Sequence, residues 1–496
     1  MRRVFILIVT FTLLPCSLRA GDPPSLENRV VEHKLSNGIT LLILERHFSP
    51  TVSIRMMFRT GSIDEDSGKT GLAHMFEHMM FKGTRTLGTR DYTAEAPLLR
   101  QVDQIHQQID REKDKGQHAD QKRVADLIDQ VRAVEEKANA LVAENELWNL
   151  YEREGASTVN ANTSRDYTQY MVDLPSNKIK LWAILDSDRV KNPVFRQFYQ
   201  EREVVKEERR MRVDTNPEGK LFEEFVGTAY HAHPYRNPTI GWDADLDHLS
   251  VSDLTEFYNR YYTPDALSIA IVGDVDSKET IALVDQYFGD WKVPAHSRIA
   301  PTEEPPQTGE RRSIVKFDAQ PHVLEGFHIP AYPDPNQVVS YAMSHLLASG
   351  TTSRLYKALV EKKKVATAVD TGQDYPGERC ASLFIISAAP RHPRTNDDVL
   401  KAIEEELDRL KKEPIADWEL EKIRSAVEVG ILDTLQTNSG MAETLIYNQT
   451  VFGDWRYLLN FQKQIRAMTA QDLQNFAKKI FVDDNKTISV LEPVKK

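Results

Sequence analysis

Cysteine is scarce in this chain, with 2 residues among 496. Two thiols cannot build a disulfide framework, so the fold must be stabilised by a buried apolar core. Basic residues are also outnumbered, because the chain has 63 Lys and Arg against 74 Asp and Glu, which gives a formal net charge of −11. An acidic chain of this kind disfavours nucleic acid as a partner. The 22 glycines and 24 prolines are too few for a collagen-like or low-complexity chain.

Long apolar runs are missing after the N-terminus. Behind Arg2 and Arg3, residues 4–14 form an apolar stretch that is too short to span a bilayer as a mature helix, and Ala20 offers a cleavage point. We therefore expect residues 1–20 to be a secretory signal peptide, with an uncleaved anchor as the alternative. The mature protein would be exported, periplasmic or secreted, and would have no stable membrane span.

Two common classes of catalytic motif are missing as well. No glycine-rich phosphate loop precedes a helical pattern and no G-x-S-x-G occurs, so nothing indicates nucleotide or serine-hydrolase chemistry. What the chain contains is an alternation of strand-like and helix-like stretches, such as residues 30–44, 51–58 and 71–82. This alternation is typical of α/β or α+β folds.

Residues 95–150 depart from that alternation. They are rich in Gln, Asp, Glu, Lys and Ala, and apolar residues recur at helical spacing within 98–109 and again within 124–141. A turn is expected at residues 115–118 between the two series. We predict an inserted antiparallel helical hairpin whose charge forms a solvated face. The sequence leaves three roles open for this hairpin: it could dock a partner, act as a gate over a chamber, or have no function.

The chain also repeats itself across a linker. Residues 296–312 hold three prolines and no apolar periodicity, which predicts a linker between an N-terminal domain at 28–295 and a C-terminal domain at 313–496. On either side, Asp253-Leu254 and the strand-like residues 268–272 match Asp472-Leu473 and residues 487–491 at a constant offset of 219. We interpret this repeat as two homologous domains made by duplication.

The strongest chemical signal is the string HMFEH at residues 74–78. On a helix, His74 and His78 lie one turn apart on the same face, where two imidazoles can hold one metal ion. Glu77 reaches the same region. This is the inverted form of the HExxH zinc motif, and it lies in an otherwise apolar helix, so the three polar groups do not form a solvated face.

Two histidines need a third ligand, because a catalytic zinc site has three protein ligands and one open position. The run EREVVKEE at residues 201–208 offers candidates. Glu201, Val204, Val205 and Glu208 share one helical face, which we expect to be buried. Buried carboxylates require partners, so either Glu could complete the site.

At these residues the chain resembles the pitrilysin family of inverzincin zinc peptidases, which includes insulin-degrading enzyme and the mitochondrial processing peptidases. Residues 74–84 (HMFEHMMFKGT) resemble its zinc helix, residues 155–175 (GASTVNANTSRDYTQYMVDLP) its substrate-side edge strand, and residues 201–211 (EREVVKEERRM) its third-ligand helix. The resemblance spans most of the chain apart from the hairpin at 95–150. It implies an α+β fold of two homologous domains, each a mostly antiparallel sheet with helices packed on one face.

The same resemblance implies roles for individual residues. His74, His78 and Glu208 would bind one Zn²⁺ per chain, and Glu201 would orient the site from behind the ligands. Glu77 would be the general base that activates a water for attack on a peptide carbonyl. Asn160 and Ala161 would present backbone groups to an extended peptide substrate, although Asn160 also suits a turn.

The chain departs from the family pattern in its second half. The family places a substrate-binding Arg and Tyr there, and the matching positions hold Val360 and Thr367. The adjacent Lys362, Lys363 and Lys364 more readily form a solvated turn than replace the Arg. We therefore expect a heterodimer in which a related subunit without zinc supplies both groups, a homodimer being less favoured. The competing hypothesis is a non-catalytic peptide-binding or assembly subunit, and metal storage is poorly supported.

Overall fold

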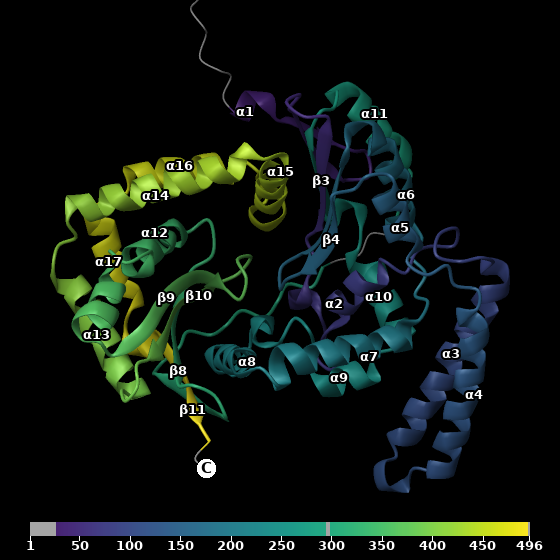
Figure 1. Ribbon diagram of the computed structural model, residues 1–496, viewed down its shortest axis with the longest axis horizontal. Coiled ribbons are helices and arrows are strands. Elements are labelled where there is room, and N and C mark those ends of the chain that lie inside the picture. The colour runs from purple at the N-terminus through teal and green to yellow at the C-terminus, as the bar shows by residue number, and fades with distance from the viewer. Residues whose placement is uncertain (1–25, 294–297, 495–496) are drawn as a thin grey trace, which may run out of the picture.

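The computed structural model describes residues 26–293 and 298–494, so the predicted signal peptide at residues 1–20 lies outside the described part. Within these ranges no helix combines the length and the apolar character that a membrane crossing needs. The chain forms two halves, each built around one sheet, and Figure 1 shows them side by side with the C-terminal half in green and yellow. The fold is α+β with two homologous domains.

The first half contains a sheet of six strands in the order β1-β2-β6-β3-β5-β4. All neighbours are antiparallel except β2 and β6. The strand β3 coincides with the strand expected at residues 51–58, and its residues are almost all buried because β5 and β6 flank it. The bounds are β1 (Val31–Lys34), β2 (Thr40–Glu45), β3 (Thr51–Phe58), β4 (Thr158–Thr163), β5 (Thr168–Pro175) and β6 (Leu267–Gly273).

Helices of the first half cover one face of this sheet. Apolar side chains of α2, α6, α10 and α11 form the core with alternate residues of the strands, as Met56, Tyr170 and Ile269 do from three adjacent strands. The helices are α1 (Leu26–Arg29), α2 (Leu72–Met79), α5 (Glu146–Arg153), α6 (Ile179–Lys191), α7 (Phe198–Arg209), α8 (Pro217–Ala229), α9 (Asp243–His248), α10 (Val251–Tyr261) and α11 (Ser277–Phe288).

The inserted hairpin projects from this half, as Figure 1 shows. It consists of α3 (Tyr92–Lys113) and α4 (Gln121–Asn139), joined by a short 3₁₀ turn at Gly116–His118. Asp91 and Asp120 cap the two helices by accepting backbone N–H groups of Ala94 and Arg123. The predicted hairpin and its turn are confirmed, although the hairpin spans residues 92–139 rather than 95–150 and a separate helix follows it.

The second half contains a sheet of five strands in the order β7-β11-β8-β10-β9, in which only β7 and β11 are parallel. Its strands are β7 (Arg311–Phe317), β8 (His322–Ile329), β9 (Ala366–Tyr375), β10 (Ser382–Pro390) and β11 (Lys486–Pro493). Its helices are α12 (Asn336–Ala348), α13 (Asn396–Lys412), α14 (Asp417–Gln436), α15 (Asn438–Tyr447), α16 (Tyr457–Ala467) and α17 (Ala470–Ile480).

The two sheets repeat one topology, as the offset of 219 residues predicts. The helix α10 and the strand β6 correspond to α17 and β11, whose first residues lie 219 positions later. Each helix begins with a capping box, made by Ser250 and Asp253 in the first half and by Thr469 and Asp472 in the second. The parallel pair β2–β6 likewise corresponds to β7–β11.

Each half lends one helix to the sheet of the other half. The helix α15, from the second half, packs against β3 and β6, where Met441, Leu445 and Ile446 join Met57 and Val272 in one cluster. In return, α8 from the first half packs against β7 and β11. Helices of its own half therefore cover one face of each sheet, as expected, and a helix of the other half covers the opposite face.

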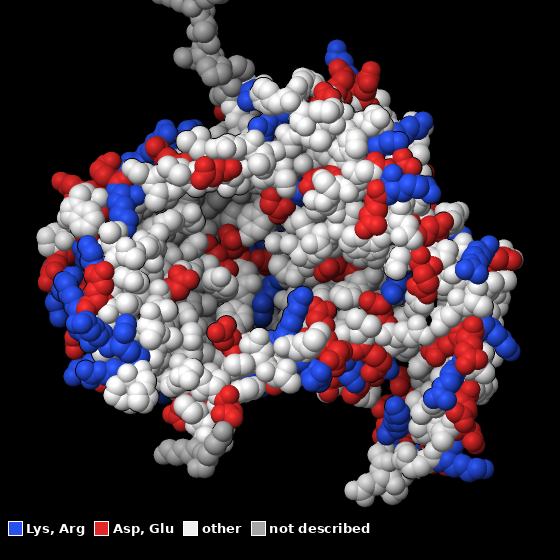
Figure 2. All heavy atoms as spheres, in the orientation of Figure 1, with Lys and Arg blue, Asp and Glu red and all other residues white. Residues whose placement is uncertain are grey.

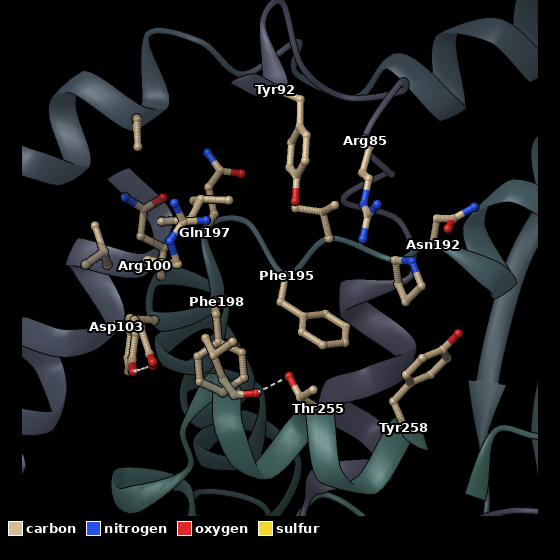
Figure 3. Close-up of a pocket in the computed structure, with 18 of the residues that line it drawn as sticks. Arg85, Tyr92, Arg100, Asp103, Asn192, Phe195, Gln197, Phe198, Thr255 and Tyr258 are labelled. Atoms are coloured by element: carbon tan, nitrogen blue, oxygen red, sulfur yellow. Dashed lines mark hydrogen bonds between the residues drawn. The ribbon is translucent and has the colours of Figure 1, made fainter. Parts of the chain in front are cut away.

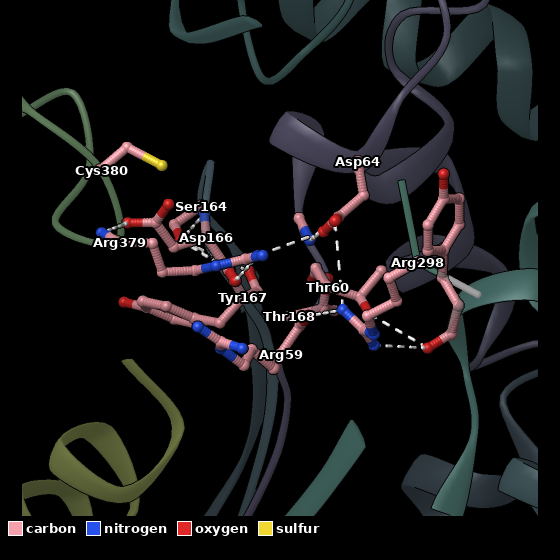
Figure 4. A network of polar contacts seen from close by, with 12 residues as sticks. Arg59, Thr60, Asp64, Ser164, Asp166, Tyr167, Thr168, Arg298, Arg379 and Cys380 are labelled. Atoms are coloured by element: carbon pink, nitrogen blue, oxygen red, sulfur yellow. Dashed lines mark hydrogen bonds and ion pairs between the residues drawn. The ribbon is translucent and has the colours of Figure 1, made fainter. Parts of the chain in front are cut away.

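Charged groups tie the halves together where the loop before β10 reaches the first half (Figure 4). The Arg379 guanidinium, whose side chain is 9% exposed, pairs with Asp64 at 3.2 Å and donates to the backbone oxygen of Asp166 at 3.1 Å. The Asp166 carboxylate accepts the N–H groups of Glu378 and Arg379. On the far side of Asp64, Arg298 donates to Thr60 and to the backbone of Tyr261. These contacts help to fix one half against the other.

Candidate active site

The helix α2 carries the HMFEH motif, and its start is held by a buried acid. Gly71 precedes the helix at φ 94°, a left-handed conformation that suits glycine, and a Cβ there would lie 2.9 Å from the backbone oxygen of Ile240. The carboxylate of Glu65 accepts the N–H groups of Gly71 and Ala73 at 2.9 and 2.8 Å. This carboxylate therefore satisfies the first free N–H groups of the helix and sets its direction.

Three metal-binding side chains meet between α2 and α7. The Nε2 atoms of His74 and His78 lie 3.7 and 3.6 Å from Oε2 of Glu208, and the ligand atoms of all three residues lie within 4.8 Å of one another. Tetrahedral zinc with ligands at about 2.1 Å separates its ligand atoms by roughly 3.4 Å, so the trio fits a zinc ion. Among the described residues this is the one such group of three.

Glu201 lies behind His78 and fixes its ring. Its Oε1 lies 2.9 Å from Nδ1 of His78, and its Oε2 lies 2.6 Å from Nζ of Lys82. Burial opposes the charged form, but the bonds from His78 and Lys82 prevail and lower the pKa of Glu201 to about 2. Burial likewise opposes protonation of His78, yet the carboxylates of Glu201, Glu77 and Glu208 raise its pKa. With Nδ1 donating to Glu201, Nε2 of His78 keeps its lone pair for a metal.

His74 is prepared for a metal in a different way. Burial, helped by the positive charges of His78 and Arg212, lowers the pKa of His74 to about 3, so the imidazole is neutral at physiological pH. Neutral imidazole is the form that binds metal ions. Its Nδ1 is buried and makes no hydrogen bond to any described residue.

Glu77 lies beside the trio on α2 and contacts a residue of β4. Oγ1 of Thr163 donates to Oε2 of Glu77 at 2.7 Å. Burial raises the pKa of Glu77, although the hydrogen bond from Thr163 and the charge of His78 oppose the rise. A carboxylate with a raised pKa beside an open metal position can accept and return a proton near neutral pH.

The strand β4 holds the two residues expected to contact substrate. It is the last strand of the sheet, so one of its edges pairs with no described strand. Asn160 is exposed and stands opposite Met171, and its Oδ1 accepts the N–H of Ala161 at 2.9 Å. Ala161 faces the same side of the strand as Thr163, because residues two apart share a face. The geometry leaves this edge open to a further strand.

One expectation about α7 is wrong. The face shared by Glu201, Val204 and Glu208 is not buried throughout, since Val204 is 51% exposed while Val205 is fully buried. The reason is that α7 packs against α2 and α9, and these contacts leave Val204 uncovered. Figure 2 shows that the molecule is hollowed between its halves on the face in view.

Three residues near the site were not identified from the sequence. Lys82 bonds Glu201, Thr163 bonds Glu77, and Arg212 pairs with Oε1 of Glu208 at 2.9 Å while its side chain stays 71% exposed. Lys82 has a signal in the sequence, because it lies four residues after His78. Arg212 has the same kind of signal, because it lies four residues after Glu208, whereas Thr163 has none, since its contact depends on where the sheet edge lies.

Two family models match the chain. The model described as Insulinase (Peptidase family M16) matches residues 41–99 and 137–243, which include α2 and α7 and leave out most of the hairpin. The model described as Peptidase M16 inactive domain matches residues 248–427.

Similar proteins are named zinc proteases. The zinc protease PqqE of Helicobacter pylori is 28% identical over 471 residues, which cover 92% of this chain and 92% of that protein. An uncharacterized zinc protease of Mycobacterium leprae is 24% identical over 432 residues, or 86% of this chain and 84% of that protein.

Solved structures share the fold. The crystal structure of a protease from Helicobacter pylori superposes with a TM-score of 0.78 at 26% identity, over 94% of this chain and 99% of that one. The periplasmic protease PqqL from Escherichia coli gives a TM-score of 0.70 at 16% identity, over 94% of this chain and 47% of that one. At this lower identity the likeness concerns the fold alone.

Proposed function

Because the chain belongs to the M16 (insulinase) family of metallopeptidases, we propose that it is an exported zinc-dependent endopeptidase subunit acting on unstructured peptides. The observation that carries the proposal is the convergence of His74, His78 and Glu208 beside the half-buried carboxylate of Glu77. A site that only stored or sensed metal would have no need of that fourth group. Export rests on the apolar stretch at residues 4–14 behind two arginines.

Each side chain has one task in this proposal. His74, His78 and Glu208 hold the ion, which would supply Lewis acidity and lower the pKa of a water molecule to about 7. Glu77 accepts the proton of the attacking water and returns it to the leaving amine. The open edge of β4 at Asn160 and Ala161 binds the peptide as an added strand and orients its carbonyl.

Glu201 offers a test of the metal site that does not depend on turnover. We expect Glu201→Gln to weaken zinc binding by about 10- to 100-fold, because His78 loses the carboxylate that fixes its ring. Competition with a chromogenic chelator measures the affinity. Glu203→Gln is the matched control, since Glu203 lies on the same helix but is exposed and forms a long ion pair with Arg202, at 3.9 Å. Equal affinities in the two variants would contradict the assigned role of Glu201.

The two positions that match the family's substrate-binding Arg and Tyr hold Val360 and Thr367. Val360 lies in a half-buried position of the π-helical segment Tyr356–Lys362, and Thr367 lies at the start of β9, where its hydroxyl donates to the backbone oxygen of Ala389. Neither side chain can donate to a peptide carbonyl as Arg and Tyr do. We therefore include in the proposal a related subunit without zinc that supplies both groups and closes a chamber around the peptide.

Cleavage of a quenched, unstructured peptide of about twenty residues tests this proposal. We expect the mature chain alone to bind one zinc and to turn over slowly, and we expect addition of the co-purified related subunit to restore chelator-sensitive cleavage. Full activity of the chain alone would refute the heterodimer and leave the peptidase standing.

The second candidate function is a non-catalytic peptide-binding subunit. Two observations favour it, namely Val360 and Thr367 in place of Arg and Tyr, and the match of residues 248–427 to a model described as inactive. It predicts zinc and peptide binding without cleavage in every assembly. The same cleavage measurement, with peptide binding followed by fluorescence anisotropy, separates the two functions.

A further inference from the structure

The hairpin forms one wall of a cavity that belongs to no part of the zinc site. The cavity has a volume of about 450 Å³ and lies between the hairpin, the loop from α6 to α7, and α10 (Figure 3). Pockets that bind small organic molecules have volumes of about 300–1,000 Å³. The cavity is therefore large enough for a molecule of that class.

Part of this wall lies outside the residues that the family model matches. The M16 model matches residues 41–99 and 137–243, so the residues between them, including Arg100, Val102, Asp103 and Glu135 of the cavity wall, lie outside it. The opposite wall comes from matched residues such as Phe195 and Phe198. A ligand bound here would thus touch both the insertion and the common scaffold.

The arginines and the acids that line the cavity differ in how they are engaged. Its acids are already engaged, since Asp103 accepts from the hydroxyl of Tyr199 at 2.6 Å and Glu135 lies 3.1 Å from Nε2 of His106. Its two arginines, Arg85 and Arg100, make no ion pair or hydrogen bond with any described residue. The cavity therefore has free cationic donors and no free carboxylate among the described acids that line it.

The arginines stand on opposite sides of an aromatic floor. Figure 3 shows Arg85 and Arg100 flanking Phe195 and Phe198, with Tyr92 pointing from above into the same space as Arg85. Flat apolar surface between cationic donors suits a molecule with a ring and an acidic group, because the ring is removed from water while the guanidinium groups pair with the anion.

We propose that this cavity is a binding site for a small aromatic organic anion, such as an aryl carboxylate or sulfonate. Its floor includes Phe198, Tyr199 and Gln200, the first turn of α7, and the next residue on that helix is Glu201. An occupant would bridge the hairpin to the helix that carries Glu201 and Glu208. This site gives the hairpin a function that is independent of whether the zinc site cleaves peptides.

The test compares two probes that differ by one charge. 8-Anilino-1-naphthalenesulfonate carries a sulfonate, and N-phenyl-1-naphthylamine has the same rings without it. We expect the full chain to bind the sulfonate saturably, one per chain, and about tenfold or more tightly than the neutral probe, because charge-assisted bonds to arginine favour the anion. The double substitution Arg85→Gln/Arg100→Gln should remove this preference.

Matched controls keep the test falsifiable. Arg132→Gln changes an exposed arginine of the same hairpin, which pairs only with Asp129, and should leave the preference intact. Hydrogen exchange should show slowed exchange in residues 92–103 and 192–200 when the sulfonate is bound. Equal affinities for the two probes, an unchanged preference in the double variant, or protection confined to β4 and α2 would each overturn the proposal. Protection of the same residues by a partner protein, with no probe binding, would overturn it in favour of a protein interface.

Discussion

Glu77→Gln is expected to lower the rate of peptide hydrolysis by about 10²- to 10⁴-fold while one zinc stays bound. Gln has nearly the same shape as Glu and can still accept the hydrogen bond that Thr163 donates at 2.7 Å, so the site should keep its structure. What disappears is the group that accepts and returns the proton. The measurement is turnover of the quenched peptide by the active assembly, with zinc quantified on the same sample.

A neighbouring glutamate provides the control for this variant. Glu207→Gln removes a carboxylate one residue before Glu208, but that carboxylate pairs on the surface with Arg210 and does not face the site. We expect it to change neither turnover nor zinc content. Full activity of Glu77→Gln would rule out Glu77 as the base, and loss of zinc would mean that Glu77 acts as a ligand.

The local arrangement of the site was predictable because two helices determine it. Spacing of four residues put His74 and His78 on one face of α2, and spacing of seven put Glu201 and Glu208 on one face of α7. The sequence left the choice of third ligand open, and only the resemblance favoured Glu208. In the structure Glu208 faces both Nε2 atoms, while Glu201 bonds the opposite side of the His78 ring.

Contacts between distant segments were beyond the sequence patterns. The exposure of Val204 depends on which neighbours cover α7, and the bond from Thr163 to Glu77 depends on the edge strand lying beside α2. The exchange of α8 and α15 between the halves was equally hidden. The apolar residues of α8 and α15 show that each helix has a side to bury, without showing which sheet will cover it.

Arg379→Met is expected to destabilise the junction between the halves by about 3–5 kcal/mol. The substitution keeps the volume of the side chain but leaves the buried carboxylate of Asp64 without its partner at 3.2 Å, so a charge in a region of low polarity is no longer compensated. Arg298 also lies near Asp64, but at 4.0 Å it is too distant for a good hydrogen bond. Urea unfolding, followed by tryptophan fluorescence, measures the shift in midpoint.

A second substitution separates charge from packing. Arg379→Met/Asp64→Asn removes both charges and should recover most of the lost stability, whereas Arg391→Met, at an exposed arginine of the same half, should cost little.

The destabilised junction should also weaken zinc binding. Asp64 adjoins Glu65, whose carboxylate holds the start of α2, so a displaced Asp64 loosens the helix that carries both histidines. Zinc affinity should therefore fall in Arg379→Met and recover in the double variant; an unchanged affinity would mean that the junction and the metal site are independent.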